Sequence, residues 1–151
     1  MTYNTGIYCI TDVYPTVLAH CSEIKKLLEE AGLLGNRNEE GLFYNLKHSD
    51  CFIVLDESTD TVVGFARVVT DWVNIYYLCD VVIDKSHRGR GLGKKLVEWI
   101  TMYEVKYSGM DGLVRTEDAH GLFSRFGFEM CRENYMVQPH HKTVPDKPVY
   151  L

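Results

Sequence analysis

A strand-like apolar run that ends in a basic, glycine-rich turn constrains the fold of this chain more than any other feature. The β-branched residues Val81–Ile83 lead into a polar turn, then into three alternating glycines among basic residues, and then into a helical stripe that begins at Leu92. Glycine lets backbone N–H groups approach an anion closely, and a helix N-terminus carries a partial positive charge. The segment therefore predicts a strand–loop–helix unit that binds a diphosphate.

The spacing of the glycines excludes the two common nucleotide loops. A Walker A loop requires glycine and then serine or threonine at the positions where this chain has Arg88 and Lys95. A Rossmann loop requires Gly-x-Gly-x-x-Gly, whereas Gly89, Gly91 and Gly93 strictly alternate with other residues. The pattern that remains is Arg-x-x-Gly-x-Gly, from Arg88 to Gly93. The alternative without a ligand site is a glycine-rich turn before a helix with a solvated basic end.

Length and composition are those of an ordinary globular protein. Of 151 residues, 46% are hydrophobic and 25% charged, so we expect a single domain over residues 1–151 that ends in an extended tail over residues 139–151. No apolar run approaches the roughly 20 residues of a membrane helix. Five scattered cysteines favour a cytoplasmic setting, and no His/Cys spacing indicates a metal site. The net charge of −5 argues against nucleic-acid binding.

Hydrophobic periodicity and turn residues predict hairpins first and strand–helix units afterwards. This order indicates an α/β (α+β mixed) class with helices on both faces of a mixed sheet. The expected strands are Tyr3–Val13, Cys51–Leu55, Val62–Thr70, Asn74–Ile83, Leu113–Arg115, Phe128–Cys131 and Tyr135–Val137. The expected helices are Pro15–Ala31, Asn38–Leu46, Leu92–Tyr107 and Asp118–Phe126.

A second motif follows the glycines at a distance of about thirty residues. The segment Asp118–Phe128 is similar to Asn-x-x-Ala-x-x-Leu-Tyr-x-x-x-Gly-Phe, with Ala119, Leu122, Gly127 and Phe128 in register. Together the two motifs resemble the GNAT superfamily of acyl-CoA-dependent N-acyltransferases, close to its small uncharacterised bacterial members. The resemblance covers roughly residues 50–130.

The resemblance implies a central mixed, mostly antiparallel sheet of about six to seven strands flanked by about four helices. It also implies acetyl-CoA as co-substrate, with no metal. The residues it assigns to the cofactor are Val81, Val82, Ile83, Arg88, Gly89, Arg90, Gly91, Leu92, Gly93, Lys94 and Thr116. Among them, the Val81 N–H would polarise the thioester oxygen, and Thr116 stands where the family often has asparagine.

The implied reaction is transfer of an acetyl group from acetyl-CoA to a primary amine, directly within a ternary complex. The acceptor would be a small molecule or a peptide, and no nucleic acid or membrane partner is expected. The oligomeric state is open, a homodimer included. The alternative is a non-catalytic acyl-CoA-binding module or sensor. Phe123 favours it, because it replaces the family's proton-donating tyrosine and has no proton to give.

Three residues are candidates for proton transfer. Tyr77 stands where some family members carry a strand glutamate, and Asp80 follows on the same strand. His120 lies on the short helix beside the expected thiol and suits acid–base chemistry, so it is the leading replacement for the missing tyrosine. The alternatives are a structural acceptor for Asp80 and a packed or solvated helix residue for His120. Cys79 as a covalent nucleophile lacks an identifiable base.

Overall fold

The computed structural model describes residues 5–9, 14–103, 107 and 109–131. A five-stranded sheet runs through it in the order β1-β2-β3-β4-β5, antiparallel from β1 to β4 and parallel between β4 and β5. The strands are β1 (Thr5–Cys9), β2 (Asp50–Asp56), β3 (Thr61–Thr70), β4 (Ile75–Ile83) and β5 (Asp111–Val114). The helices are α1 (Tyr14–Ala19), α2 (Cys21–Glu30), α3 (Glu39–Lys47), α4 (Leu92–Glu98) and α5 (His120–Ser124).

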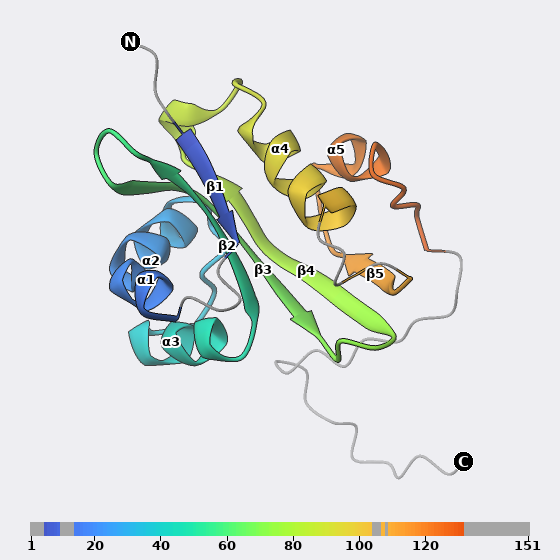
Figure 1. Cartoon of the computed structure of the whole chain (residues 1–151), viewed down its shortest axis with the longest axis horizontal. Helices are drawn as coiled ribbons and strands as arrows, with labels where there is room; N and C mark the ends of the chain where they lie inside the picture. Colours follow the sequence, from blue (N-terminus) through green and yellow to red (C-terminus); the bar gives the residue numbers. More distant parts are fainter. Residues whose placement is uncertain (1–4, 10–13, 104–106, 108, 132–151) are drawn as a thin grey trace, which may run out of the picture.

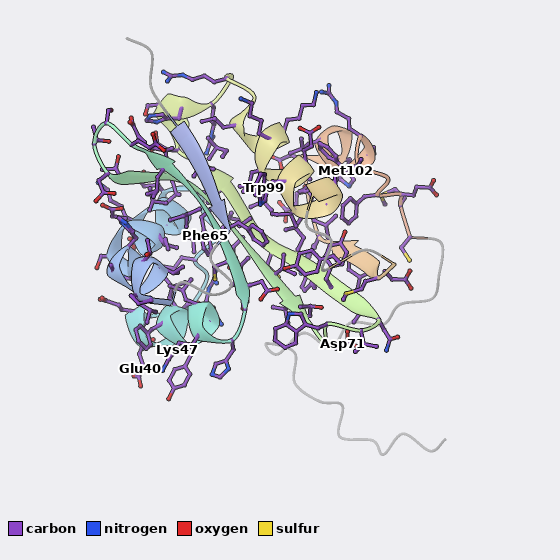
Figure 2. The ribbon with its side chains drawn as sticks, viewed as in Figure 1. Glu40, Lys47, Phe65, Asp71, Trp99 and Met102 are labelled. Carbon is purple, nitrogen blue, oxygen red and sulfur yellow. The ribbon has the colours of Figure 1, made fainter. Side chains whose placement is uncertain are left out.

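Helices cover both faces of the sheet (Figure 1). The first three helices pack on one face, and α4 and α5 on the other. Every residue of β2 is buried because its side chains alternate between two cores. Ile53 points to the core beneath α1–α3, and Phe52 to the core beneath α4 and α5. Figure 2 shows Phe65 between the sheet and the first helical layer.

Local signals set the ends of two predicted helices as expected. The Asn38 side chain accepts a hydrogen bond from the Gly41 N–H at 2.8 Å and so caps α3. Gly32 has φ of +71° and follows α2, where the Leu33 N–H bonds back to the Leu28 carbonyl at 2.8 Å. The predicted helix Pro15–Ala31 is nevertheless two helices, because the chain turns at His20 and the His20 ring pairs with Glu23 at 2.8 Å.

Two further predictions about elements need correction. The helix that begins at Leu92 changes after Glu98 into a π-helical turn, Trp99–Tyr103, where the Thr101 hydroxyl bonds to the Val97 carbonyl at 2.8 Å. The described sheet has five strands rather than six to seven. Residues 128–131 form no strand, and their expected partner, residues 135–137, lies outside the described residues, as does the expected tail. None of the helices in the described part of the chain has the length and apolar character to span a bilayer.

Candidate active site

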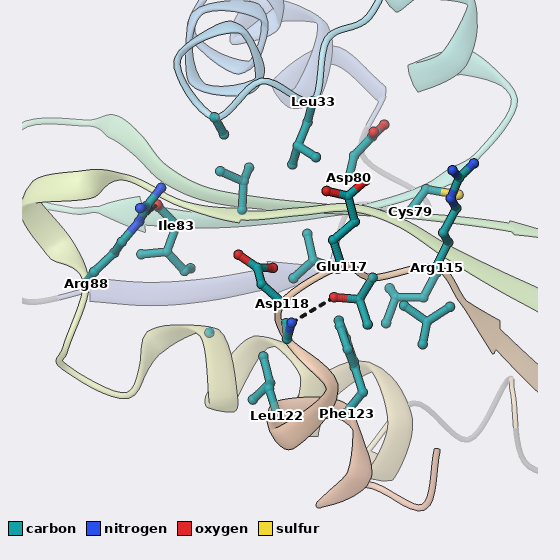
Figure 3. Close-up of a pocket in the computed structure, with 18 of the residues that line it drawn as sticks. Leu33, Cys79, Asp80, Ile83, Arg88, Arg115, Glu117, Asp118, Leu122 and Phe123 are labelled. Carbon is teal, nitrogen blue, oxygen red and sulfur yellow. Dashed lines mark hydrogen bonds between the residues drawn. The ribbon is translucent and has the colours of Figure 1, made fainter. Parts of the chain in front are cut away.

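The site lies where β4 and β5 part. The two strands pair from Ile75 and Asp111 only as far as Leu78 and Val114, whereas β4 continues to Ile83. A cavity of about 900 Å³ opens along this part of β4. It is walled by the turn after α2, the residues around the glycines, the β5–α5 loop and the start of α5 (Figure 3). The C-terminal part of β4 is thus open to a ligand lying between β4 and β5.

A bulge distorts β4 inside this cavity. Phe65 of β3 faces Val82, whereas Arg67 faces Cys79. Two residues of β4, Asp80 and Val81, therefore lie opposite one residue of β3, and Asp80 takes a φ of +54°. A positive φ is uncommon for a residue with a side chain, which marks this bulge as a feature that the surrounding structure must hold in place.

The backbone beyond the bulge presents polar groups to the cavity. The Asp84 N–H bonds to the Val63 carbonyl at 2.8 Å, so Val82, two residues earlier, also directs its N–H and C=O toward β3. By the same alternation, the Ile83 N–H and the Val81 carbonyl point away from β3, to the side that β5 has left. Val82 is buried in the core beneath the first helical layer and also lines the cavity.

The glycine loop, Arg88–Lys94, forms one end of the cavity. Gly89 and Gly91 have φ of +75° and +76°, and a side chain at either position would meet nothing within 4 Å. Gly91 is the N-cap of α4, so the first N–H groups of this helix have no intrahelical acceptor. The side chains of Arg88, Arg90 and Lys94 are exposed and give the loop positive charge, and Arg88 is the one of the three that lines the cavity. The loop therefore offers a concave backbone surface suited to an anion.

The turn before the glycine loop is anchored to the sheet. Asp84 accepts a hydrogen bond from the Ser86 N–H at 3.0 Å and contacts the His87 ring at 2.8 Å. Hydrogen bonds from Ser86, and then from His87, hold the pKa of Asp84 below its usual value. Arg88 donates from Nε to the Ile83 carbonyl at 2.9 Å, which binds the start of the loop to the end of β4.

Asp80, in the bulge of β4, is held by two guanidinium groups. Arg37 donates to both of its oxygens, at 2.8 and 3.0 Å, and Arg67 donates from Nε at 2.8 Å. Burial alone would raise the pKa of Asp80, but these hydrogen bonds and the two positive charges hold it below its usual value. We call Arg37, Arg67 and Asp80 the arginine cluster. A carboxylate held in this way is a poor proton acceptor, which favours the structural alternative for Asp80.

Arg37 reaches this cluster from the α2–α3 loop with every donor engaged. Beyond the two bonds to Asp80, its guanidinium donates to the carbonyls of Leu33 and Leu34 and to the Asn45 side chain. These bonds use all five N–H groups of the side chain. Arg37 thus ties the bulge in β4 to the first helical layer, 43 residues away in sequence.

Of the other candidate residues, Tyr77 and Cys79 line the cavity and His120 does not. Tyr77 lines the cavity, and burial, followed by the nearby Cys79, raises its pKa, so the phenol keeps its proton and cannot accept one. Burial likewise raises the pKa of Cys79, which makes its thiol a poor nucleophile. His120 is exposed at the start of α5 and is absent from the cavity wall. The geometry therefore does not support His120 as the replacement for the missing tyrosine.

Phe123 and Thr116 both line the cavity, as the family motif implies. Phe123 is buried and packs edge-on against Phe128, with ring centroids 5.8 Å apart. Thr116 accepts the Ala119 N–H on its hydroxyl oxygen at 2.9 Å (dashed in Figure 3). This bond leaves the hydroxyl proton available to a ligand.

Sequence reasoning missed two carboxylates in the cavity wall. Glu117 and Asp118 lie in the β5–α5 loop, both exposed, and both line the cavity. The one signal for them was their position directly before Ala119 in the second motif. The arginine cluster was also missed, because it joins residues from three separate segments. Within the described residues, no group of His, Cys, Asp or Glu is arranged to hold a metal.

Comparison with known proteins agrees with this architecture. Residues 47–130 match the family model "Acetyltransferase (GNAT) domain". A protein of Xanthomonas campestris pv. campestris assigned to the GNAT acetyltransferases is 28% identical with a TM-score of 0.72, covering 87% of this chain and 94% of that one.

Two more distant structures share the fold alone. Glucosamine-6-phosphate N-acetyltransferase of Arabidopsis thaliana is 16% identical with a TM-score of 0.64, covering 92% of this chain and 99% of that one. A Clostridium acetobutylicum protein described as a predicted acetyltransferase, and solved with acetyl-CoA, is 13% identical with a TM-score of 0.67, covering 91% of this chain and 99% of that one. Because the family model spans more than half of the sequence, this chain belongs to the GNAT acetyltransferases and is an acyltransferase.

Proposed function

We propose that this enzyme moves an acetyl group from acetyl-CoA to a primary amine, directly within a ternary complex. The observation that carries the proposal is the cavity between the parted strands β4 and β5, with the glycine loop at one end. An extended thioester fits such a gap, because its pyrophosphate can lie against the loop while its arm runs beside the free edge of β4. The Clostridium acetobutylicum structure, which has the same fold, contains acetyl-CoA.

The residues of the loop suit a pyrophosphate. A phosphate oxygen could approach the N–H groups of Gly89 to Lys94 closely, because no side chain covers Gly89 or Gly91. Arg88, Arg90 and Lys94 would add charge-assisted hydrogen bonds, and Leu92 contributes its backbone N–H. The hydroxyl of Thr116 would donate to the pantetheine arm.

Bound acetyl-CoA would supply the activated acetyl group. The Val81 N–H belongs to the bulge peptide, outside the regular ladder with β3, and we assign it to the thioester oxygen. Ile83 would hydrogen-bond the pantetheine arm through its N–H. Tyr77, which keeps its proton, is suited to orient the acceptor or to donate a hydrogen bond to the leaving thiolate. The raised pKa of Cys79 favours direct transfer over an acyl-enzyme route.

Thermal unfolding with CoA tests the binding half of this proposal. A ligand that binds only the native state raises the melting temperature. At a concentration of 100 Kd it adds about 2.7 kcal/mol to the free energy of unfolding. We expect CoA to raise Tm, and pantetheine, which lacks the pyrophosphate, to raise it far less. An unchanged Tm at millimolar CoA would contradict the proposed site. Release of free CoA thiol from acetyl-CoA in the presence of primary amines tests the transfer itself.

A further inference from the structure

Transfer to an amine requires a group that takes a proton, and this requirement singles out one side chain of the cavity. An amine is mostly an ammonium ion at neutral pH and has no lone pair until a proton leaves. The need for such a group rests on the proposed function, since the group acts on the acceptor of that reaction. The group sought must line the cavity, must be able to accept a proton, and must not already be committed to another partner.

Most titratable groups of the cavity fail one of these conditions. Asp80 is committed to Arg37 and Arg67. Tyr77 and Cys79 keep their protons, because burial raises the pKa of each. His87 contacts Asp84 and lies beside the glycine loop, at the end assigned to the pyrophosphate.

The two carboxylates of the β5–α5 loop remain. The bond from the Ala119 N–H to the Thr116 hydroxyl folds the loop into a tight turn, with Glu117 and Asp118 as its two middle residues. Figure 3 shows Glu117 reaching across the cleft toward β4 near Asp80. Asp118 is turned toward the side on which Arg88 and Ile83 lie. The longer side chain therefore points to the stretch of β4 that contains the bulge, where the Val81 N–H is assigned to the thioester.

We infer that Glu117 is the catalytic base and that its carboxylate takes the proton of the acceptor's ammonium group. The freed nitrogen lone pair forms the C–N bond to the acetyl carbon, and the C–S bond breaks with its electron pair on the CoA sulfur. The nitrogen then loses its second proton, which neutralises the thiolate, and Glu117 returns the first proton to water. Because the second proton of the nitrogen neutralises the thiolate, this path needs no separate acid and is compatible with Phe123. The acceptor class is a cationic primary amine.

The experiment compares wild type with Glu117→Gln, a change that removes the charge and keeps the shape. Spermidine, tyramine and a lysine-containing tripeptide serve as acceptor probes, and the probe that wild type acetylates fastest is used throughout. We expect kcat/KM at neutral pH to fall at least about 100-fold, the usual contribution of a general base. The CoA-induced rise in Tm should stay unchanged. Glu129→Gln, exposed and outside the cavity wall, is the matched control and should behave as wild type.

The pH dependence separates a base from a structural residue. The defect of Glu117→Gln should shrink as pH rises, because a growing fraction of the acceptor is then already deprotonated. Glu117→Asp should recover part of the rate. A rate equal to wild type, a defect independent of pH, or a larger loss in Asp118→Asn would each overturn the assignment while leaving the proposed function intact. Absence of turnover by wild type with every probe would instead overturn the proposed transfer, and this inference with it.

Discussion

Two parts of the site, the glycine loop and the arginine cluster, are built in different ways. The glycine loop is made of consecutive residues, and the groups proposed to bind its ligand are backbone N–H groups, which two left-handed glycines leave uncovered. The arginine cluster joins side chains from the α2–α3 loop, β3 and β4, and its hydrogen bonds hold a bulge in place. The glycine loop therefore depends on local conformation, and the arginine cluster on contacts between distant segments. This difference predicts that substitutions in the loop and in the cluster affect different properties.

The largest effect on stability is expected from Asp80→Asn at the arginine cluster. The substitution leaves two half-buried guanidinium groups without their counter-charge. Breaking a fully buried pair typically costs about 3–5 kcal/mol, and we expect a loss near the lower end of that range. Chemical denaturation should show a loss of this size in the free energy of unfolding. Asp118→Asn is the matched control, since Asp118 is exposed, and it should change stability by less than about 0.5 kcal/mol. Equal effects of the two substitutions would contradict the structural role of Asp80.

The stabilities of Asp80→Asn and Asp118→Asn should depend differently on pH in the acid range. The pKa of Asp80 is lower in the folded chain than its ordinary value of 3.8, so its contribution to stability is complete above that value. The contribution is lost as pH falls from 3.8 through the lower folded pKa. Over that range the stability of wild type should approach that of Asp80→Asn, whereas Asp118→Asn should stay parallel to wild type.

The second largest effect is expected from a substitution in the glycine loop, and it is an effect on CoA binding rather than on stability. Gly91→Val places a β-branched residue at a φ of +76° and a side chain on the surface assigned to the pyrophosphate. We expect the CoA-induced rise in Tm to disappear. Gly35→Val is the control, because Gly35 also has a positive φ, of +61°, with open space around it, and lies outside the cavity wall.

The two glycine variants should lose similar stability without ligand, about 1–2 kcal/mol for a left-handed residue with a side chain. Only Gly91→Val should lose the response to CoA. If Gly35→Val lost it equally, the effect would stem from general destabilisation, and the backbone surface of the loop would not be the anion site.

This contrast also explains what the sequence could reveal. The loop was predictable because Gly89, Gly91 and the start of α4 are neighbours in the chain, so their spacing alone carries the geometry. The helix cap at Asn38 and the helix end at Gly32 were predictable for the same reason. The bond between Arg37 and Asp80 spans 43 residues, and no local pattern encodes it. Sequence reasoning therefore proposed Asp80 as a base without knowing that two guanidinium groups hold it.

Failures in predicting elements have the same origin. The strand expected at residues 128–131 contains one strongly strand-forming residue, Phe128, and strand structure also depends on a neighbour to pair with. Leu92, Leu96 and Ile100 of the predicted helical stripe are buried, yet periodicity alone does not reveal the π-helical turn that begins at Trp99. Glu117 and Asp118 became candidates only when the fold placed the β5–α5 loop opposite the end of β4.

The smallest effect is expected from Cys79→Ser, which tests whether the cavity works without a covalent intermediate. Burial raises the pKa of the Cys79 thiol, and the Asp80 charge adds to the rise while Arg67 opposes it. The thiol therefore stays protonated, and kcat should remain within about threefold of wild type, a change of well under 1 kcal/mol in the barrier. In double-reciprocal plots, initial rates at varied concentrations of acetyl-CoA and amine should give intersecting lines, as expected for a ternary complex.

Cys131→Ser, at an exposed position outside the cavity wall, is the control for loss of any thiol. Parallel initial-rate lines, or an acetyl group on the intact protein after incubation with acetyl-CoA alone, would identify Cys79 as a nucleophile. That result would also change the comparison between the glycine loop and the arginine cluster. The guanidinium of Arg67, which holds Asp80, would then act on a thiolate as well, and the arginine cluster would belong to the chemistry rather than to the support of the bulge.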